Sequence, residues 1–140
     1  MVNVNLWGKT QRPLEADVMK EIKQFLEVKG IFGFRNNSGA YKDGDRYVTY
    51  GHKGSPDFIC IFPGDAMGNG AGRFWFLEAK RPGGKLSDSQ LEFIRHARAH
   101  GAVITVAESS FDLETQLKNW RSPCSERYEK AINLWSTKKT

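Results

Sequence analysis

Charged residues occupy positions of this sequence where apolar side chains are expected. In residues 73–80 (RFWFLEAK), side chains of a strand alternate between two faces, so Glu78 and Lys80 lie on the face that begins with Phe74. Burying a charge is costly unless the charge is paired or binds a metal ion. The pattern therefore predicts either an ion pair or a metal site at the end of an aromatic strand.

A second carboxylate, Asp57, opens the apolar run 57–62 (DFICIF), directly after a Gly-Ser-Pro sequence. If this run pairs with the aromatic strand through the glycine-rich loop 63–72, the start of one strand meets the end of the other. The pairing brings Asp57 alongside Glu78 and Lys80.

A third carboxylate comes from the amphipathic helix expected over 14–29, where Glu15 lies within about 40° of the centre of the apolar direction. Three carboxylates in one place suit Mg²⁺ or Mn²⁺. Such an ion stabilises charge developing on a phosphodiester and lowers the pKa of a bound water. Beside it, Lys80 could orient or deprotonate the attacking water, or neutralise the phosphate. Alone, a Glu-x-Lys pair favours an ordinary salt bridge, and the full set favours a metal site.

The elements that must position these residues follow from periodicity and turn residues. Strands are expected over 30–38, within 41–56, and over 57–62, 73–80 and 102–107, and further helices near 87–100, 110–120 and 125–136. Ser87 and Gln90 form a capping box at the start of the second helix. This order predicts an α/β fold with a mixed sheet flanked by helices.

Composition bounds the protein class. The chain has 140 residues, 39% of them hydrophobic, and a net charge of +5, which fits one domain over 1–140 and excludes a disordered chain. Two distant cysteines exclude a disulfide framework. Without an apolar run of ~18 residues or a secretory signal, the expected location is cytoplasmic.

Several short motifs together resemble a known nuclease superfamily. The carriers are Glu15, Arg35-Asn36-Asn37-Ser38-Gly39, Gly54-Ser55-Pro56-Asp57, Glu78-Ala79-Lys80, and Ser89, Gln90 and Phe93. Over about 14–107 the sequence resembles the PD-(D/E)xK superfamily, most closely its VRR-NUC branch, the virus-type replication-repair nuclease domain. The C-terminal helices at about 110–136 carry no motif of this kind.

The resemblance implies a restriction-endonuclease-like fold and specific roles. Asp57, Glu78 and the Ala79 carbonyl would bind a divalent metal ion, with Glu15 acting on a second ion or its water. Lys80 would be the catalytic lysine. Gln90 would support the site from its helix, although the capping box explains a glutamine there equally well. Water would attack the phosphodiester in line, leaving 5′-phosphate and 3′-hydroxyl ends.

Polar and basic residues around these motifs are candidates for DNA contacts. They are Arg35, Asn37, Lys53, Arg81 and Lys85. Basic residues around an acidic centre attract a phosphodiester substrate, although solvated surface positions explain any single one, and turn chemistry explains Arg35 and Asn37. His96 and His100, four residues apart on a helix, lack a third ligand and a general base and favour no metal site. His52 precedes the Gly-Ser-Pro-Asp segment, and the sequence leaves open whether it lies near the metal.

The sequence thus predicts a Mg²⁺-dependent endonuclease for branched DNA. The resemblance implies resolution of four-way (Holliday) junctions by a homodimer, because two symmetric cuts call for two symmetric sites. Trp120 and Trp135 are candidates for the dimer interface. Alternatives are a nuclease of the same fold for flap, single-stranded or duplex DNA, a non-catalytic nucleic-acid-binding module, and a charge network that only stabilises the core.

Overall fold

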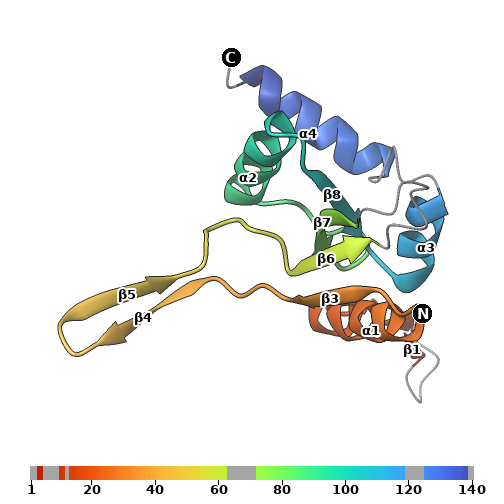
Figure 1. Ribbon diagram of the computed structural model, residues 1–140, viewed down its shortest axis with the longest axis horizontal. Helices are drawn as coiled ribbons and strands as arrows, with labels where there is room; N and C mark the ends of the chain where they lie inside the picture. The colour runs from red at the N-terminus through yellow and green to blue at the C-terminus, as the bar shows by residue number, and fades with distance from the viewer. Residues whose placement is uncertain (1–2, 5–9, 12, 63–71, 119–124, 139–140) are drawn as a thin grey trace.

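A mixed four-stranded sheet forms the centre of the protein. The computed structural model describes residues 3–4, 10–11, 13–62, 72–118 and 125–138. The elements are β1 (Asn3–Val4), β2 (Thr10–Gln11), α1 (Glu15–Val28), β3 (Phe32–Arg35), β4 (Gly39–Asp43), β5 (Arg46–Tyr50), β6 (Phe58–Phe62), β7 (Arg73–Ala79), α2 (Asp88–Ala99), β8 (Val103–Ala107), α3 (Ser110–Lys118) and α4 (Glu126–Lys138). The central sheet has the order β3-β6-β7-β8 (Figure 1).

The register of this sheet confirms the predicted pairing of the two apolar runs. β3, β6 and β7 are antiparallel neighbours, and β8 adds to β7 in the parallel direction. Phe58 at the start of β6 pairs with Leu77 near the end of β7. The start of β6 and the end of β7 therefore meet at one end of the sheet.

Helices cover both faces of the sheet and give three layers. On one side, α1 and α3 enclose a core that includes Ile22, Leu77 and Leu113. On the other side, α2 and α4 enclose a second core with Ile94, Val106 and Ile132. This α/β arrangement is a restriction-endonuclease-like fold, as the resemblance implied.

The helix boundaries follow local sequence signals. Ser87 is the N-cap of α2: its hydroxyl accepts from the Gln90 N–H at 3.2 Å, and its own N–H donates to Gln90 Oε1 at 2.9 Å. The predicted capping box is confirmed. In α1, Val18, Ile22 and Leu26 recur every four residues and bury one stripe against the sheet.

The segment between β3 and β6 differs from its prediction. In place of a strand of the mixed sheet, β4 and β5 form a separate antiparallel hairpin that projects from the body (Figure 1). Gly44, at φ +60°, allows the chain to reverse within the two-residue loop Gly44-Asp45. That glycine loop is the sequence signal for the hairpin.

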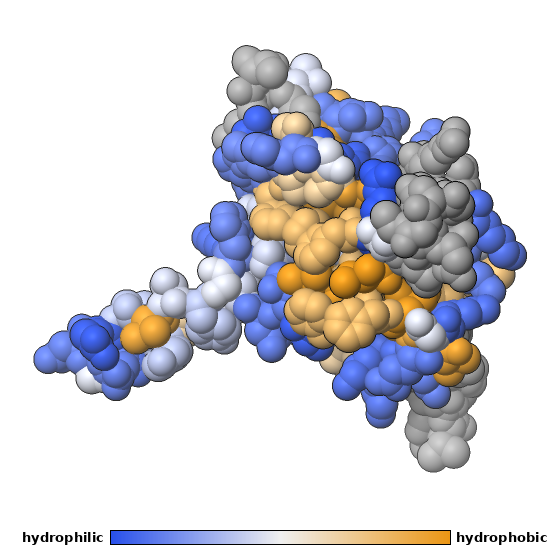
Figure 2. Space-filling model, viewed as in Figure 1, coloured by the Kyte–Doolittle hydropathy of each residue, from blue (hydrophilic) through white to orange (hydrophobic). Residues whose placement is uncertain are grey.

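One part of the sheet stays uncovered on the α2 side. Phe32, Ile61 and Phe74 are neighbours across β3, β6 and β7, and they are 65%, 38% and 53% exposed; Phe34 is 49% exposed. We call these four side chains the open face. Figure 2 shows hydrophobic side chains gathered over these strands, beneath α2 in the view.

Some residues that the sequence analysis singled out lie outside the described part of the chain. The predicted loop 63–72, apart from its last residue, lies outside the described residues, as do Trp120 and Cys124.

Cys60 is fully buried on β6, and burial raises the pKa of its thiol to about 12, so it is a small apolar core residue as expected. Among the described helices, none has the length and apolar character to span a membrane.

Candidate metal centre

Three carboxylates from three elements meet at the end of the sheet. Glu15 is the first residue of α1, Asp57 directly precedes β6, and Glu78 is the second-last residue of β7. One oxygen atom of each lies within 4.8 Å of the others. Among the described residues this is the one group of three or more His, Cys, Asp or Glu side chains with metal-binding geometry. The antiparallel pairing of β6 and β7 produces it.

Asp57 is fixed by hydrogen bonds to both its side chain and its backbone. The Ala79 N–H donates to Asp57 Oδ2 at 2.9 Å, and Arg35 Nη1 lies 3.3 Å from Oδ1. The Asp57 carbonyl accepts from Arg35 Nη1 at 3.1 Å and from the Asn36 N–H at 2.8 Å. The carboxylate is therefore oriented by β3 and β7 before any ligand binds.

The Gly-Ser-Pro sequence before Asp57 is held just as closely. Asn36 Nδ2 donates to Ser55 Oγ and to the Pro56 carbonyl, both at 2.9 Å. Gly54 has φ +84°, and a Cβ atom there would lie 2.1 Å from the Ser89 carbonyl in the first turn of α2. Only glycine permits this approach.

Glu78 and Lys80 are buried ionisable side chains. Glu78 is 2% exposed and Lys80 is 7% exposed. Lys80 Nζ lies 3.8 Å from Glu78 Oε1 and 4.0 Å from Glu15 Oε1. Burial, together with the charge of Asp57, raises the pKa of Glu78 to about 9, while Lys80 opposes the rise. Two cations, Lys80 and Arg35, thus lie beside three carboxyl groups, so the cluster has one negative charge in excess when all three are ionised.

The donor set fits a hard divalent cation. Carboxylate oxygens are the ligands that Mg²⁺ and Mn²⁺ prefer, and the cluster contains neither histidine nor thiolate. A bound ion would supply the missing positive charge and displace the proton that the raised pKa places on Glu78. Ala79 contacts the cluster through its N–H, and metal binding by its carbonyl stays a prediction.

Gln90 makes both of the contacts that the sequence left open. Its Oε1 closes the capping box with Ser87, and its Nε2 donates to Glu78 Oε1 at 2.6 Å. The first turn of α2 therefore holds the Glu78 carboxyl group in place. The role of Gln90 in catalysis stays a prediction.

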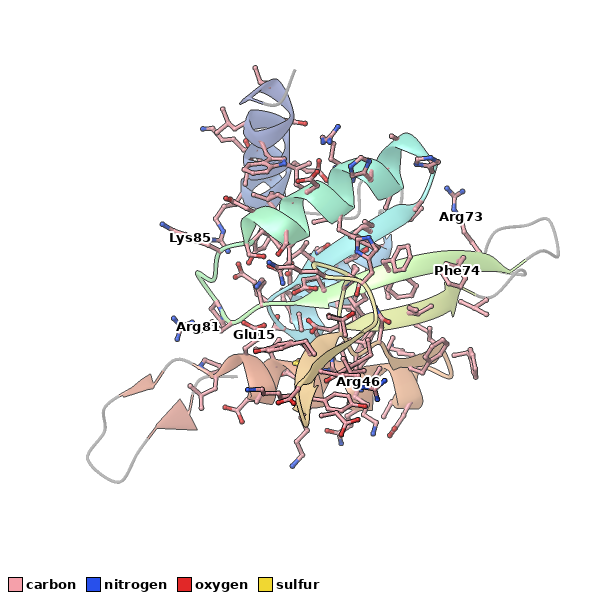
Figure 3. All side chains as sticks on the ribbon, turned by 90° about the vertical axis from the view of Figure 1, so that its left-hand side faces the viewer. Glu15, Arg46, Arg73, Phe74, Arg81 and Lys85 are labelled. Atoms are coloured by element: carbon pink, nitrogen blue, oxygen red, sulfur yellow. The ribbon has the colours of Figure 1, made fainter. Side chains whose placement is uncertain are left out.

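The predicted DNA contacts fall into two groups. Arg35 Nη2 donates to Asn37 Oδ1 at 3.2 Å, so these two residues contact each other while Arg35 also holds Asp57. Lys53, Arg81 and Lys85 are exposed. Figure 3 shows Arg81 and Lys85 on the side of the molecule that carries Glu15. DNA binding by all five residues stays a prediction.

Sequence reasoning missed how β3 supports the centre. Arg35 and Asn36 suggested a turn or a phosphate contact, and the structure directs both toward Asp57 and its preceding residues. The available signal was their position at the end of a strand next to the Asp57 strand. His52 lies outside the cluster, with its ring 5.4 Å from that of Phe93.

The fold and the centre together define a restriction-endonuclease-like protein with a candidate metal site. A family model for the VRR-NUC domain matches residues 41–111, which is 71 of 140 residues. The chain belongs to the VRR-NUC domain family, as the sequence motifs indicated, and membership implies a nuclease-type function with DNA as the substrate. No curated protein and no solved structure matches the chain.

Proposed function

We propose that this protein is a Mg²⁺- or Mn²⁺-dependent endonuclease that cuts branched DNA inside the cell. The proposed substrate is the four-way junction, and the proposed active form is a homodimer. The observation that carries the proposal is the cluster of Glu15, Asp57 and Glu78 with the buried Lys80 beside it. Buried charges of this kind are expensive unless they serve a bound ion and a substrate.

The residues of the cluster have different roles in the proposed hydrolysis. When bound, the divalent ion supplies charge for the phosphodiester and acidifies a water. The three carboxylates hold the ion, and the Lys80 ammonium lies where it can orient the attacking water or neutralise the phosphate. Arg35 and the Ala79 N–H fix the Asp57 carboxylate.

Surface charge supports a nucleic-acid substrate. The chain carries 21 Lys and Arg against 16 Asp and Glu. The exposed Arg81 and Lys85 share the side of the molecule with Glu15 (Figure 3). Cations around an acidic centre raise the local concentration of a polyanion and offset repulsion from the carboxylates.

A nuclease of the same fold for flap or duplex DNA is the second candidate, because no feature of the centre selects one DNA geometry. A non-catalytic binding module is disfavoured, since Glu15, Asp57, Glu78 and Lys80 are all present and assembled. A purely structural charge network is disfavoured because the cluster holds three carboxyl groups against two cations, Lys80 and Arg35.

The test is cleavage of end-labelled single strands, duplex, splayed arms, flaps and a four-way junction, with Mg²⁺ or with EDTA. We expect paired symmetric cuts in the junction, lost in EDTA and in Lys80→Ala. The matched control is Lys130→Ala, an exposed lysine on α4 outside the candidate DNA contacts, which should retain most activity.

Other outcomes redirect or end the proposal. Cutting confined to flaps or duplex keeps the nuclease and changes its substrate. No Mg²⁺-dependent cutting of any substrate contradicts the proposal and favours the binding module.

A further inference from the structure

Outside the metal centre, the open face gathers exposed apolar side chains from neighbouring strands in one place. Phe32, Phe34, Ile61 and Phe74 come from three adjacent strands and lie 38–65% exposed. A fully exposed aromatic side chain offers about 200 Å², so these four expose roughly 400 Å² of apolar surface. The largest apolar patch on a typical monomer is about 300–600 Å², and such a patch is often functional.

The open face continues into a groove beside α2. Phe74 packs edge-on against Phe76 with ring centroids 5.6 Å apart, Phe76 against Phe93 at 5.3 Å, and Phe93 against His52 at 5.4 Å. Phe76, Phe93 and His52 line a groove of about 660 Å³. The surface therefore has a flat part, the open face, and a hollow part, the groove beside α2. This shape favours a protein partner with a complementary surface.

The charge of this surface argues against DNA as its occupant. None of the four side chains of the open face is charged, whereas nucleic-acid binding depends on lysine and arginine at the phosphates. Depletion of charge and enrichment of aromatic residues are typical of the centre of a protein–protein interface. The described part of the chain also exposes Phe111, on α3, which serves below as a matched control.

We propose that the open face is the surface on which a second copy of this chain docks, with a two-fold axis through β3, β6 and β7. An uncharged apolar face is complementary to itself, as a two-fold interface requires. Two copies would bury roughly 800 Å² of apolar side-chain area, about half of a standard interface of ~1,600 Å². An interface of this size fits a weak, reversible dimer.

This choice of partner rests on the proposed function. Alternation along β7 puts Glu78 and Lys80 on the same face of the sheet as Phe74, at the other end of the strand. In Figure 3, Phe74 lies on the opposite side of the view from Glu15. Docking through the open face thus leaves both metal centres clear and places them symmetrically about the axis. The interface also replaces the one expected from Trp135, which packs into the core between α2 and α4.

The test is the mass of the full chain in solution without DNA, by sedimentation equilibrium from about 1 to about 100 µM protein. The variants are Phe74→Glu and Phe32→Glu, with Phe111→Glu as the matched control, because Phe111 is 77% exposed on another surface. Phe74→Leu keeps the face apolar. Circular dichroism checks that each variant is folded.

We expect the wild type, Phe111→Glu and Phe74→Leu to reach twice the 15.9 kDa of one chain. Phe74→Glu and Phe32→Glu should remain monomers, with association weakened at least ~100-fold. A monomeric wild type across the range overturns the inference, and so does a dimer that both glutamate variants leave intact. The measurement contains no DNA, so loss of the dimer surface and failure of the nuclease proposal are distinguishable.

Discussion

At one end of β7 the charged side chains of Glu78 and Lys80 are buried, whereas at the other end the aromatic side chain of Phe74 is exposed. Phe74 and Glu78 lie on the same face of this strand, and Lys80 directly follows its last residue. Ordinary folding energetics favour the reverse at both ends, since burial stabilises apolar groups and penalises charges. Each end is therefore incomplete in the isolated chain.

The missing component differs between the two ends. The carboxylate end has three carboxyl groups and only two cations, Lys80 and Arg35, and a divalent cation would supply the remaining positive charge. The open face lacks apolar contact, which another protein surface would supply. Burying ionisable groups at one end of β7 and exposing aromatic groups at the other both reduce stability. Such a strand is expected where a functional site takes precedence over stability.

The largest effect should come from Asp57→Asn. The amide removes a charged ligand from the cluster and keeps the shape, so cleavage should fall by about 10³-fold or more while the fold persists. Single-turnover cleavage measures the loss, and gel-shift binding of the same DNA should stay within a few-fold of wild type. Equal loss of binding and cleavage would contradict a role in chemistry.

The next effect concerns the open face. Phe74→Glu should still nick DNA at single sites, but paired incision of one junction should fall by about 10-fold to 100-fold, because each metal centre then works alone. A cruciform plasmid distinguishes nicked from linear products. Phe111→Glu should linearise as the wild type does; linear product at wild-type rates from Phe74→Glu contradicts the account.

Gln90→Ala separates the two contacts of Gln90. Loss of its bond to Glu78 should lower the catalytic rate about 10-fold, and loss of the capping box should cost about 1 kcal/mol of stability. Ser87→Ala is the matched variant, because it removes a cap hydroxyl and leaves the Glu78 contact. If both variants lose the same activity, Gln90 acts only through the helix.

A pH-dependent stability effect should follow from Glu78. In metal-free protein, its pKa lies near 9 when folded, against 4.5 for the free side chain. The folded state therefore retains a proton that the unfolded state releases, so Glu78 increasingly destabilises the fold as pH rises from about 5 to about 9. Glu78→Gln lacks this penalty.

Urea denaturation in EDTA measures this effect. Glu78→Gln should match the wild type near pH 5 and exceed it by about 5 kcal/mol at pH 8. A stabilising ion pair between Glu78 and Lys80 predicts the opposite, a loss of about 3 kcal/mol.

The smallest effect lies away from both ends of β7. The Ser110 hydroxyl, followed by its backbone N–H, holds the pKa of Glu21 below its usual value of 4.5. Glu21 therefore contributes stability above about pH 4.5, and the contribution is lost as pH falls through the lowered pKa. Glu21→Gln should lose less than about 1 kcal/mol at pH 7 and leave cleavage unchanged. A large loss of cleavage would extend the site beyond the cluster.

The carboxylate end was predictable because its signals are local. Strand alternation placed Glu78 with Lys80, antiparallel pairing added Asp57, and the helical period directed Glu15 toward the sheet. The capping box likewise fixed the start of α2. Each of these placements depends on the side-chain period of a strand or helix, or on the pairing of two strands that follow each other in the sequence.

The open face was not predictable because coverage is a tertiary property. Phe74 and Phe76 have the same type and the same phase, yet α2 places Phe93 against Phe76 and leaves Phe74 exposed. How much of a sheet a helix covers depends on contacts between residues that are far apart in the sequence. The contact from Arg35 to Asp57 was missed for the same reason, since it joins residues 22 apart across two strands.

The most direct test of the metal centre is thermal unfolding with and without Mn²⁺, on the wild type and on Asp57→Asn, in the absence of DNA. Mn²⁺ at ten times its dissociation constant stabilises a folded protein by about 1.4 kcal/mol, which raises the Tm of a chain this size by about 4 °C. We expect this rise in the wild type and none in Asp57→Asn. An unchanged Tm in the wild type, or an equal rise in both proteins, would contradict a metal centre at Glu15, Asp57 and Glu78.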